Sequence, residues 1–180
     1  MAKGKWAQGI RPRHFYWIID GQLAVCERPG GYGANHRKVR RQEEIIWIRE
    51  NQFDFVISVI PSNHNLHNYD ELGVAWKHWP LAPTLDRNAA LTTIFPELRR
   101  LLQSGATLLV HGEELGDRLA GVLAGYLRWS GMVPETTTAI VVMERILARQ
   151  MGPEGRAFVA AAEHCAGPAP ADAPAQGPNG

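Results

Sequence analysis

Two short apolar runs near the amino end of the chain surround a polar pair. Residues 16–19 and 22–26 are almost entirely apolar, and Asp20 and Gly21 stand between them. An Asp-Gly pair in this setting favours a tight β-hairpin, because glycine adopts positive φ angles without a steric penalty. The sequence therefore predicts two antiparallel strands joined at Asp20 and Gly21.

Beyond this hairpin, strand-like and helix-like segments alternate. Short apolar runs predict strands, and apolar residues at helical spacing predict helices. The expected strands are residues 53–60, 74–79 and 106–110. The expected helices are residues 36–50, 88–102, 116–129 and 134–149, with one more that begins at Pro153. This alternation predicts an α/β fold with a mainly parallel central sheet flanked by helices.

Composition places the chain among ordinary globular proteins. Its 180 residues carry a formal net charge of +1, and 45% of them are hydrophobic. No apolar run is long enough to span a bilayer, and the first residues do not read as a secretory signal. The two cysteines, Cys26 and Cys165, fit no metal spacing and suit a reducing compartment. We expect a cytoplasmic protein without a cofactor and without a specific nucleic-acid partner.

The segment with the clearest chemistry is His-Gly-Glu-Glu-Leu-Gly-Asp-Arg, residues 111–118, which links an expected strand to an expected helix. Such a loop gathers backbone N–H groups, and the helix N-terminus adds partial positive charge, so the loop favours an anion. Arg118 can clamp a phosphate with two parallel hydrogen bonds. The expected ligand-binding residues are His111, Gly112, Glu113, Glu114, Leu115, Gly116, Asp117 and Arg118.

This frame resembles the dual-specificity branch of the cysteine-based protein tyrosine phosphatases, especially small atypical members. That family carries His-Cys, five residues and Arg between a strand and a helix, and residues 111–118 fill the frame without a gap. The expected hairpin and the helix after Arg118 also resemble the family. The resemblance implies a flexible segment at residues 1–13, a phosphatase-like domain at 14–164, and a disordered Ala/Pro/Gly tail at 165–180.

Three positions depart from the family pattern where its chemistry is performed. Gly112 stands at the position of the nucleophilic cysteine and has no side chain to attack phosphorus. Leu81, after Trp79 and Pro80, stands near the position of the general acid and has no proton to give. Leu119 replaces the hydroxyl residue that follows the arginine. Asp86, five residues beyond Leu81, is the one nearby carboxylate that could swing in as an acid.

The loop also carries three carboxylates, Glu113, Glu114 and Asp117. A like charge about 4 Å from a bound anion costs on the order of 4 kcal/mol at an effective dielectric near 20. Side chains that point away from the anion would cost much less. An internal ion pair between Arg118 and one of these carboxylates is therefore an alternative to phosphate binding.

Three functional hypotheses follow from this combination. The first is a catalytically inactive phosphatase-like protein, or pseudophosphatase, that binds a phosphorylated ligand or a protein partner through the altered loop. The second is a hydrolase of phosphoesters or other esters in which a loop carboxylate activates water. The third is a structural interaction domain with no ligand in the loop. The sequence leaves the ligand and the oligomeric state open.

The remaining candidates have simpler interpretations. His64, His67 and His78 lack a full ligand set, so we expect solvated histidines and no metal site. The basic run 37–41 is expected to be a solvated helix face, with a docking patch for an anionic partner as the alternative. Cys26 is expected to be a buried apolar residue, far from the loop in sequence. Trp17, Trp47, Trp76 and Trp79 are expected in the core, whereas Trp6 and Trp129 are expected to be partly exposed.

Overall fold

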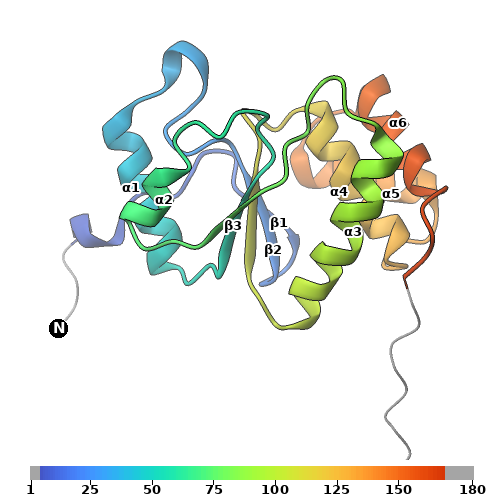
Figure 1. Cartoon of the computed structure of the whole chain (residues 1–180), viewed down its shortest axis with the longest axis horizontal. Helices are drawn as coiled ribbons and strands as arrows, with labels where there is room; N and C mark the ends of the chain where they lie inside the picture. The colour runs from blue at the N-terminus through green and yellow to red at the C-terminus, as the bar shows by residue number, and fades with distance from the viewer. Residues whose placement is uncertain (1–4, 169–180) are drawn as a thin grey trace, which may run out of the picture.

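The computed structural model describes residues 5–168, which form a mixed α/β fold around one sheet (Figure 1). The sheet has five strands in the order β1-β2-β5-β3-β4. Only the pairing of β1 with β2 is antiparallel, and the other three pairings are parallel. The strands are β1 (Tyr16–Ile19), β2 (Leu23–Cys26), β3 (Phe55–Ser58), β4 (Trp76–His78) and β5 (Leu108–His111). The predicted mainly parallel α/β class is confirmed.

The predicted hairpin forms at Asp20 and Gly21. Gly21 has a φ of +68°, and the backbone N–H of Gln22 donates to the carbonyl of Ile19 at 3.0 Å. Glycine has no Cβ to oppose this left-handed conformation, so the residue type fixes where the chain reverses. The hairpin adds β1 to the edge of the sheet beside β2.

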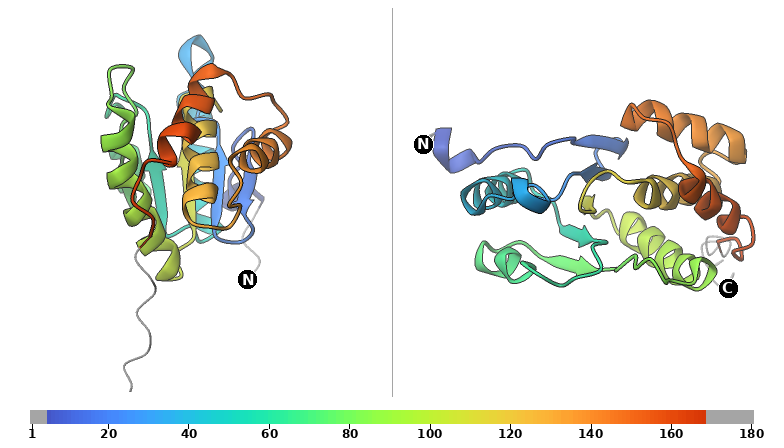
Figure 2. Two further views of the ribbon diagram at one scale, coloured as in Figure 1. Left: turned by 90° about the vertical axis from the view of Figure 1, so that its right-hand side faces the viewer. Right: turned by 90° about the horizontal axis from the view of Figure 1, so that it is seen from above.

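Helices cover both faces of the sheet (Figures 1 and 2). One face carries α1 (Lys38–Glu50) and α2 (His67–Glu71); the other carries α3 (Arg87–Gln103), α4 (Asp117–Trp129), α5 (Thr136–Leu147) and α6 (Pro153–Ala162). Two short 3₁₀ helices occupy Lys5–Gln8 and Gly33–Asn35. Among residues 5–168 no helix is long and apolar enough to cross a membrane.

Strand side chains alternate between two separate cores. On β5, Leu108 and Val110 belong to the larger core under α3 to α6, whereas Leu109 belongs to the smaller core under α1 and α2. The register aligns four residues in one row at the carboxyl ends of the parallel strands: Cys26, His111, Ser58 and His78. This edge of the sheet is where ligands bind in many open α/β folds.

Two tryptophan assignments from the sequence are wrong. Trp17 is 37% exposed, because β1 is an edge strand and its indole lies on Phe53 at the margin of the smaller core. Trp129 is only 7% exposed and donates from Nε1 to the carbonyl of Ala166 at 2.7 Å. Trp47, Trp76 and Trp79 are half-buried against the two cores.

The ends of the chain only partly fall within the described residues. Part of the segment expected to be flexible, Lys5–Gln8, is the first 3₁₀ helix and lies against α1. Ala166 in the expected tail is bonded to Trp129, and residues 169–180 lie outside the described residues. The side chain of Trp6 also lies outside them. The domain boundaries stay predictions.

Candidate functional site

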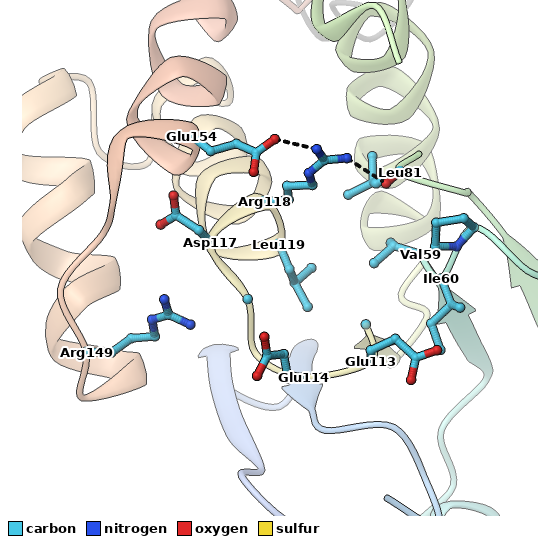
Figure 3. Close-up of a pocket in the computed structure, with 13 residues that line it drawn as sticks. Val59, Ile60, Leu81, Glu113, Glu114, Asp117, Arg118, Leu119, Arg149 and Glu154 are labelled. Atoms are coloured by element: carbon cyan, nitrogen blue, oxygen red, sulfur yellow. Dashed lines mark hydrogen bonds and ion pairs between the residues drawn. The ribbon is translucent and has the colours of Figure 1, made fainter. Parts of the chain in front are cut away.

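An open pocket of about 410 Å³ lies at the β5–α4 loop, residues 112–116 (Figure 3). Most of the residues expected to bind a ligand contribute to it. Its lining includes Gly112, Glu113, Glu114, Gly116, Asp117 and Arg118. Residues from outside the loop complete it, notably Val59, Leu81, Arg149 and Glu154. His111 and Leu115 are the two expected residues that do not line this pocket.

His111 faces the other side of the sheet. Its Nδ1 donates to the carbonyl of Gly112 at 3.1 Å, since that oxygen can only accept. Burial lowers the pKa of His111 to about 4, so the ring is neutral near pH 7. Nε2 then accepts from the hydroxyl of Tyr69 in α2 at 3.1 Å. His111 is thus a structural link between α2 and the start of the loop, which agrees with the role expected for it.

Gly112 forms the buried floor of the pocket. A Cβ added there would lie 3.0 Å from the carbonyl oxygen of Glu114, 3.6 Å from Val59 and 3.7 Å from Leu119. A carbonyl oxygen therefore lies where the side chain of a nucleophile would begin. A carbonyl oxygen carries partial negative charge, so in this conformation the floor of the pocket is unfavourable to an anion.

Two of the three loop carboxylates are bonded to other parts of the protein. Arg28 Nη1 donates to both carboxylate oxygens of Glu113 at 3.0 Å. Asp117 accepts from the backbone N–H groups of Gly152 and Gly155, both at 2.6 Å, and so caps the start of α6. Glu114 is exposed, and its carboxylate has no polar partner among the described residues.

Arg118 points across the pocket and is already bonded. Its Nη2 lies 2.6 Å from the carboxylate of Glu154 in α6, and its Nη1 donates to the carbonyl of Leu81 at 3.2 Å (Figure 3). The sequence suggested an internal pair with a loop carboxylate, and this partner is wrong. The acid comes from α6 instead. Because Asp117 caps the same helix, adjacent loop residues fix both the position of α6 and the salt bridge.

No acid group occupies the expected position of the general acid. Leu81 is 4% exposed and packs in the larger core. Asp86 is the N-cap of α3, where its Oδ1 accepts from the backbone N–H of Ala89 at 2.9 Å. A capping carboxylate would have to give up this bond in order to swing toward the pocket. Leu119, after Arg118, is 3% exposed.

Cys26 is closer to the loop than its sequence position suggested. It pairs with His111 across β2 and β5, but its side chain belongs to the smaller core on the opposite face from the pocket floor. Burial raises its pKa well above the ordinary value, and Glu44 and Glu27 raise it further. A thiol in this position does not ionise near neutral pH, so it cannot replace the missing nucleophile. Cys165 packs at the edge of the larger core, after α6.

The expected solvated histidines differ from one another. His64 and His67 are exposed, and His67 begins α2, which the sequence did not predict. His78 is partly buried, and its Nε2 donates to the carbonyl of Ile60 at 2.7 Å. Across residues 5–168, no group of three or more His, Cys, Asp or Glu side chains is placed to hold a metal ion.

Comparison with known proteins gives similarity at the level of structure. No protein-family profile and no curated protein sequence matches the chain. The fold is similar to that of Tk-PTP in its active form, with a TM-score of 0.65, 18% identity, and coverage of 84% of this chain and 97% of that one. It is also similar to kinase-associated phosphatase with its catalytic-site cysteine replaced by serine (TM-score 0.67, 20% identity, 82% and 92% covered) and to human DUSP28 (0.61, 15%, 86% and 96%). The chain thus has the fold of the dual-specificity phosphatases.

Proposed function

We propose that this protein is a pseudophosphatase, a phosphatase-fold protein that binds a phosphorylated ligand, alone or on a protein partner, without hydrolysing it. The observation that carries the proposal is Gly112 at the pocket floor, while Arg118 remains at the pocket with two guanidinium nitrogens directed at oxygen atoms. Covalent phosphoryl transfer has no starting atom at Gly112, whereas anion recognition by Arg118 is still possible. Binding would require Arg118 to exchange Glu154 for the ligand.

A neighbouring pocket supports the involvement of a larger partner. It has a volume of about 340 Å³ and is lined in part by Tyr16 and Tyr32. Glu114 and Arg149 line both pockets, so the two adjoin. Arg149 adds a second cation beside Arg118, and its Nη1 donates to the carbonyl of Leu115. A phosphorylated peptide would fit this arrangement, with the phosphate at Arg118 and flanking residues over the second pocket.

Thermal unfolding with tungstate, together with an aryl phosphate assay, tests the proposal. We expect no turnover above background and a saturable rise in melting temperature, because a ligand that binds only the native state stabilises it. Arg118→Ala should abolish the rise. Glu154→Gln should tighten tungstate binding by up to about fivefold, since a partly exposed salt bridge contributes at most about 1 kcal/mol.

The Glu97–Arg100 pair on α3 provides the matched control. It is also a partly exposed Arg–Glu bridge, and it does not line the pocket. Glu97→Gln and Arg100→Ala should leave the tungstate response unchanged. No response in the wild-type protein would instead favour an interaction domain without a ligand in the loop. Turnover that disappears in Arg118→Ala would overturn the proposal.

A second candidate, a hydrolase with a carboxylate base, is narrowed to a single residue. Glu113 and Asp117 are bonded to Arg28 and to the start of α6, whereas Glu114 stands free at the pocket mouth. A carboxylate without a competing donor is the better base for activating water. Screening a panel of ester and phosphoester substrates with wild type, Glu114→Gln and Cys26→Ser identifies it. Hydrolysis that is lost only in Glu114→Gln would favour this candidate.

A further inference from the structure

The basic run 37–41 does not form a uniformly solvated helix face. Arg37, Lys38 and Val39 are exposed as expected, but Arg40 and Arg41 turn inward. Arg40 bonds to the buried carboxylate of Glu44 at 2.7 Å. Arg41 instead reaches a small pocket between α1, α2 and the carboxyl ends of β3 and β5, on the opposite face of the sheet from the loop pocket.

This small pocket contains two buried polar atoms that lack a described partner. They are Nε of Arg41 and Oγ of Ser58, and both residues line the pocket. Ser58 is fully buried. Native proteins rarely leave such atoms unsatisfied, and each unmade hydrogen bond costs roughly 1–3 kcal/mol. The space between the lining residues is about 10 Å³, close to what one water-sized particle requires.

The charges around the pocket indicate what the particle is. The lining includes Arg28, Arg41 and His64 and no aspartate or glutamate. Arg28 is bonded to Glu113, which lies outside this lining, and Arg41 Nη1 is bonded only to the ring of His36. Glu71, the nearby carboxylate on α2, is bonded to Asn68. The pocket thus presents an excess of cationic groups.

The polar atoms themselves also favour an acceptor. Arg41 Nε can only donate, and the hydroxyl of Ser58 is free to donate. The hydroxyl of Tyr69 already donates to His111, so it is not available to bond a neutral water as a donor. A particle that accepts two hydrogen bonds and carries negative charge satisfies every one of these groups.

We propose that this pocket binds a small monovalent anion of the size of chloride, held by Arg41 and Ser58. Bound there, the anion would join α1 to the end of β3 beside His111, the residue that begins the β5–α4 loop. The site is separate from the loop pocket, and the proposal does not depend on the proposed function. A single buried water is the competing occupant.

The first test is diffraction from crystals of the full chain grown in sodium bromide. We expect an anomalous bromide peak within about 3.5 Å of Arg41 Nε and Ser58 Oγ. Density for a water at this position, with no anomalous peak, would overturn the proposal. This measurement needs no variant, so it does not depend on whether a substituted protein folds.

The second test compares thermal unfolding in chloride and in gluconate at constant ionic strength. Chloride at ten times its dissociation constant should raise the melting temperature by roughly 3 to 6 °C over gluconate, and the rise should saturate. Ser58→Ala and Arg41→Gln should remove the difference between the salts. The matched controls Ser62→Ala and Arg37→Gln, both at exposed positions, should retain it. Identical curves for the wild-type protein in the two salts would refute the site.

Discussion

The side chains of the β5–α4 loop act mainly on the rest of the protein. Asp117 illustrates this, because both of its carboxylate oxygens are bonded to N–H groups at the start of α6. That helix start has free N–H groups and partial positive charge, and a carboxylate satisfies both. A charge that the sequence suggested would disfavour an anion therefore stabilises the packing of α6.

Replacing Asp117 by alanine should lower the free energy of unfolding by about 1–3 kcal/mol. The reason is the loss of two hydrogen bonds at a helix N-terminus, together with their favourable charge. Urea unfolding measures the change. Glu114→Ala is the control from the same loop, and we expect it to change stability by less than about 0.5 kcal/mol because its side chain is exposed and without a described partner. Equal effects would contradict the capping role.

The partner of Arg118 shows what sequence reasoning could not reach at this scale. The position of Arg118 at the loop end followed from the His-x₆-Arg frame. Glu154 lies in another helix, and no local pattern connects the two residues. They meet only because α6 packs on α4. A signal did exist in Gly121, Gly125 and Gly155, whose spacing on two helices allows close approach, but glycine spacing alone does not identify the helix that fills the space.

At the scale of elements, the contact between α4 and α6 positions the edge of the pocket. A Cβ on Gly121 would lie 2.4 Å from the carbonyl oxygen of Gly155, closer than any atoms can approach. Gly125 faces Ala162 and Phe95 almost as closely. Small residues at these positions let the two helices touch along their backbones, and this places Glu154 within reach of Arg118.

Gly121→Ala distinguishes helix propensity from packing by the sign of its effect. In an isolated helix this change is favourable by about 1 kcal/mol. Here the added methyl group meets backbone atoms that cannot rotate away, so we expect destabilisation by about 1–3 kcal/mol in urea unfolding. The same variant should bind tungstate more tightly, since displacement of α6 frees Arg118. Stabilisation would show that α6 moves without cost.

The elements predicted from the sequence are those with strong local signals. The Asp20-Gly21 turn determined the hairpin, and apolar periodicity determined α3, α4 and α5 to within a few residues. The helix expected at residues 36–50 begins at Lys38 instead, because Arg37 has an extended backbone. The helix α2 was not predicted. It has five residues, too few to show a helical period, and its packing through Leu66 and Tyr69 stabilises it.

At the scale of the whole molecule, His111 lies where the two halves of the structure meet. It belongs to β5, its ring faces the smaller core beside Tyr69, and the loop that follows it forms the pocket on the other face. Alternation along the strand thus separates two polar regions that adjoin in sequence. The sequence analysis treated Cys26 as remote from this point, because strand order in a parallel sheet cannot be read from one sequence.

The buried, neutral state of His111 makes the stability of the whole fold depend on pH. Its pKa is lowered to about 4 in the folded protein and lies near 6.5 in the unfolded chain, so the unfolded chain binds more protons between these values. Stability should therefore fall as pH decreases from about 6.5 to about 4. From pH 7 to pH 5 the loss attributable to His111 should be roughly 1–2 kcal/mol.

Urea unfolding of the wild type and of His111→Gln at the two pH values isolates this contribution. Glutamine can bond Tyr69 without titrating, so the variant should lose roughly 1–2 kcal/mol less than the wild type on acidification. His36, whose pKa is lowered mainly by burial, and Glu44, whose pKa is raised mainly by burial, titrate in both proteins and cancel in the comparison. Parallel losses in the two proteins would show that His111 becomes protonated in the folded state, with the loop rearranged around it.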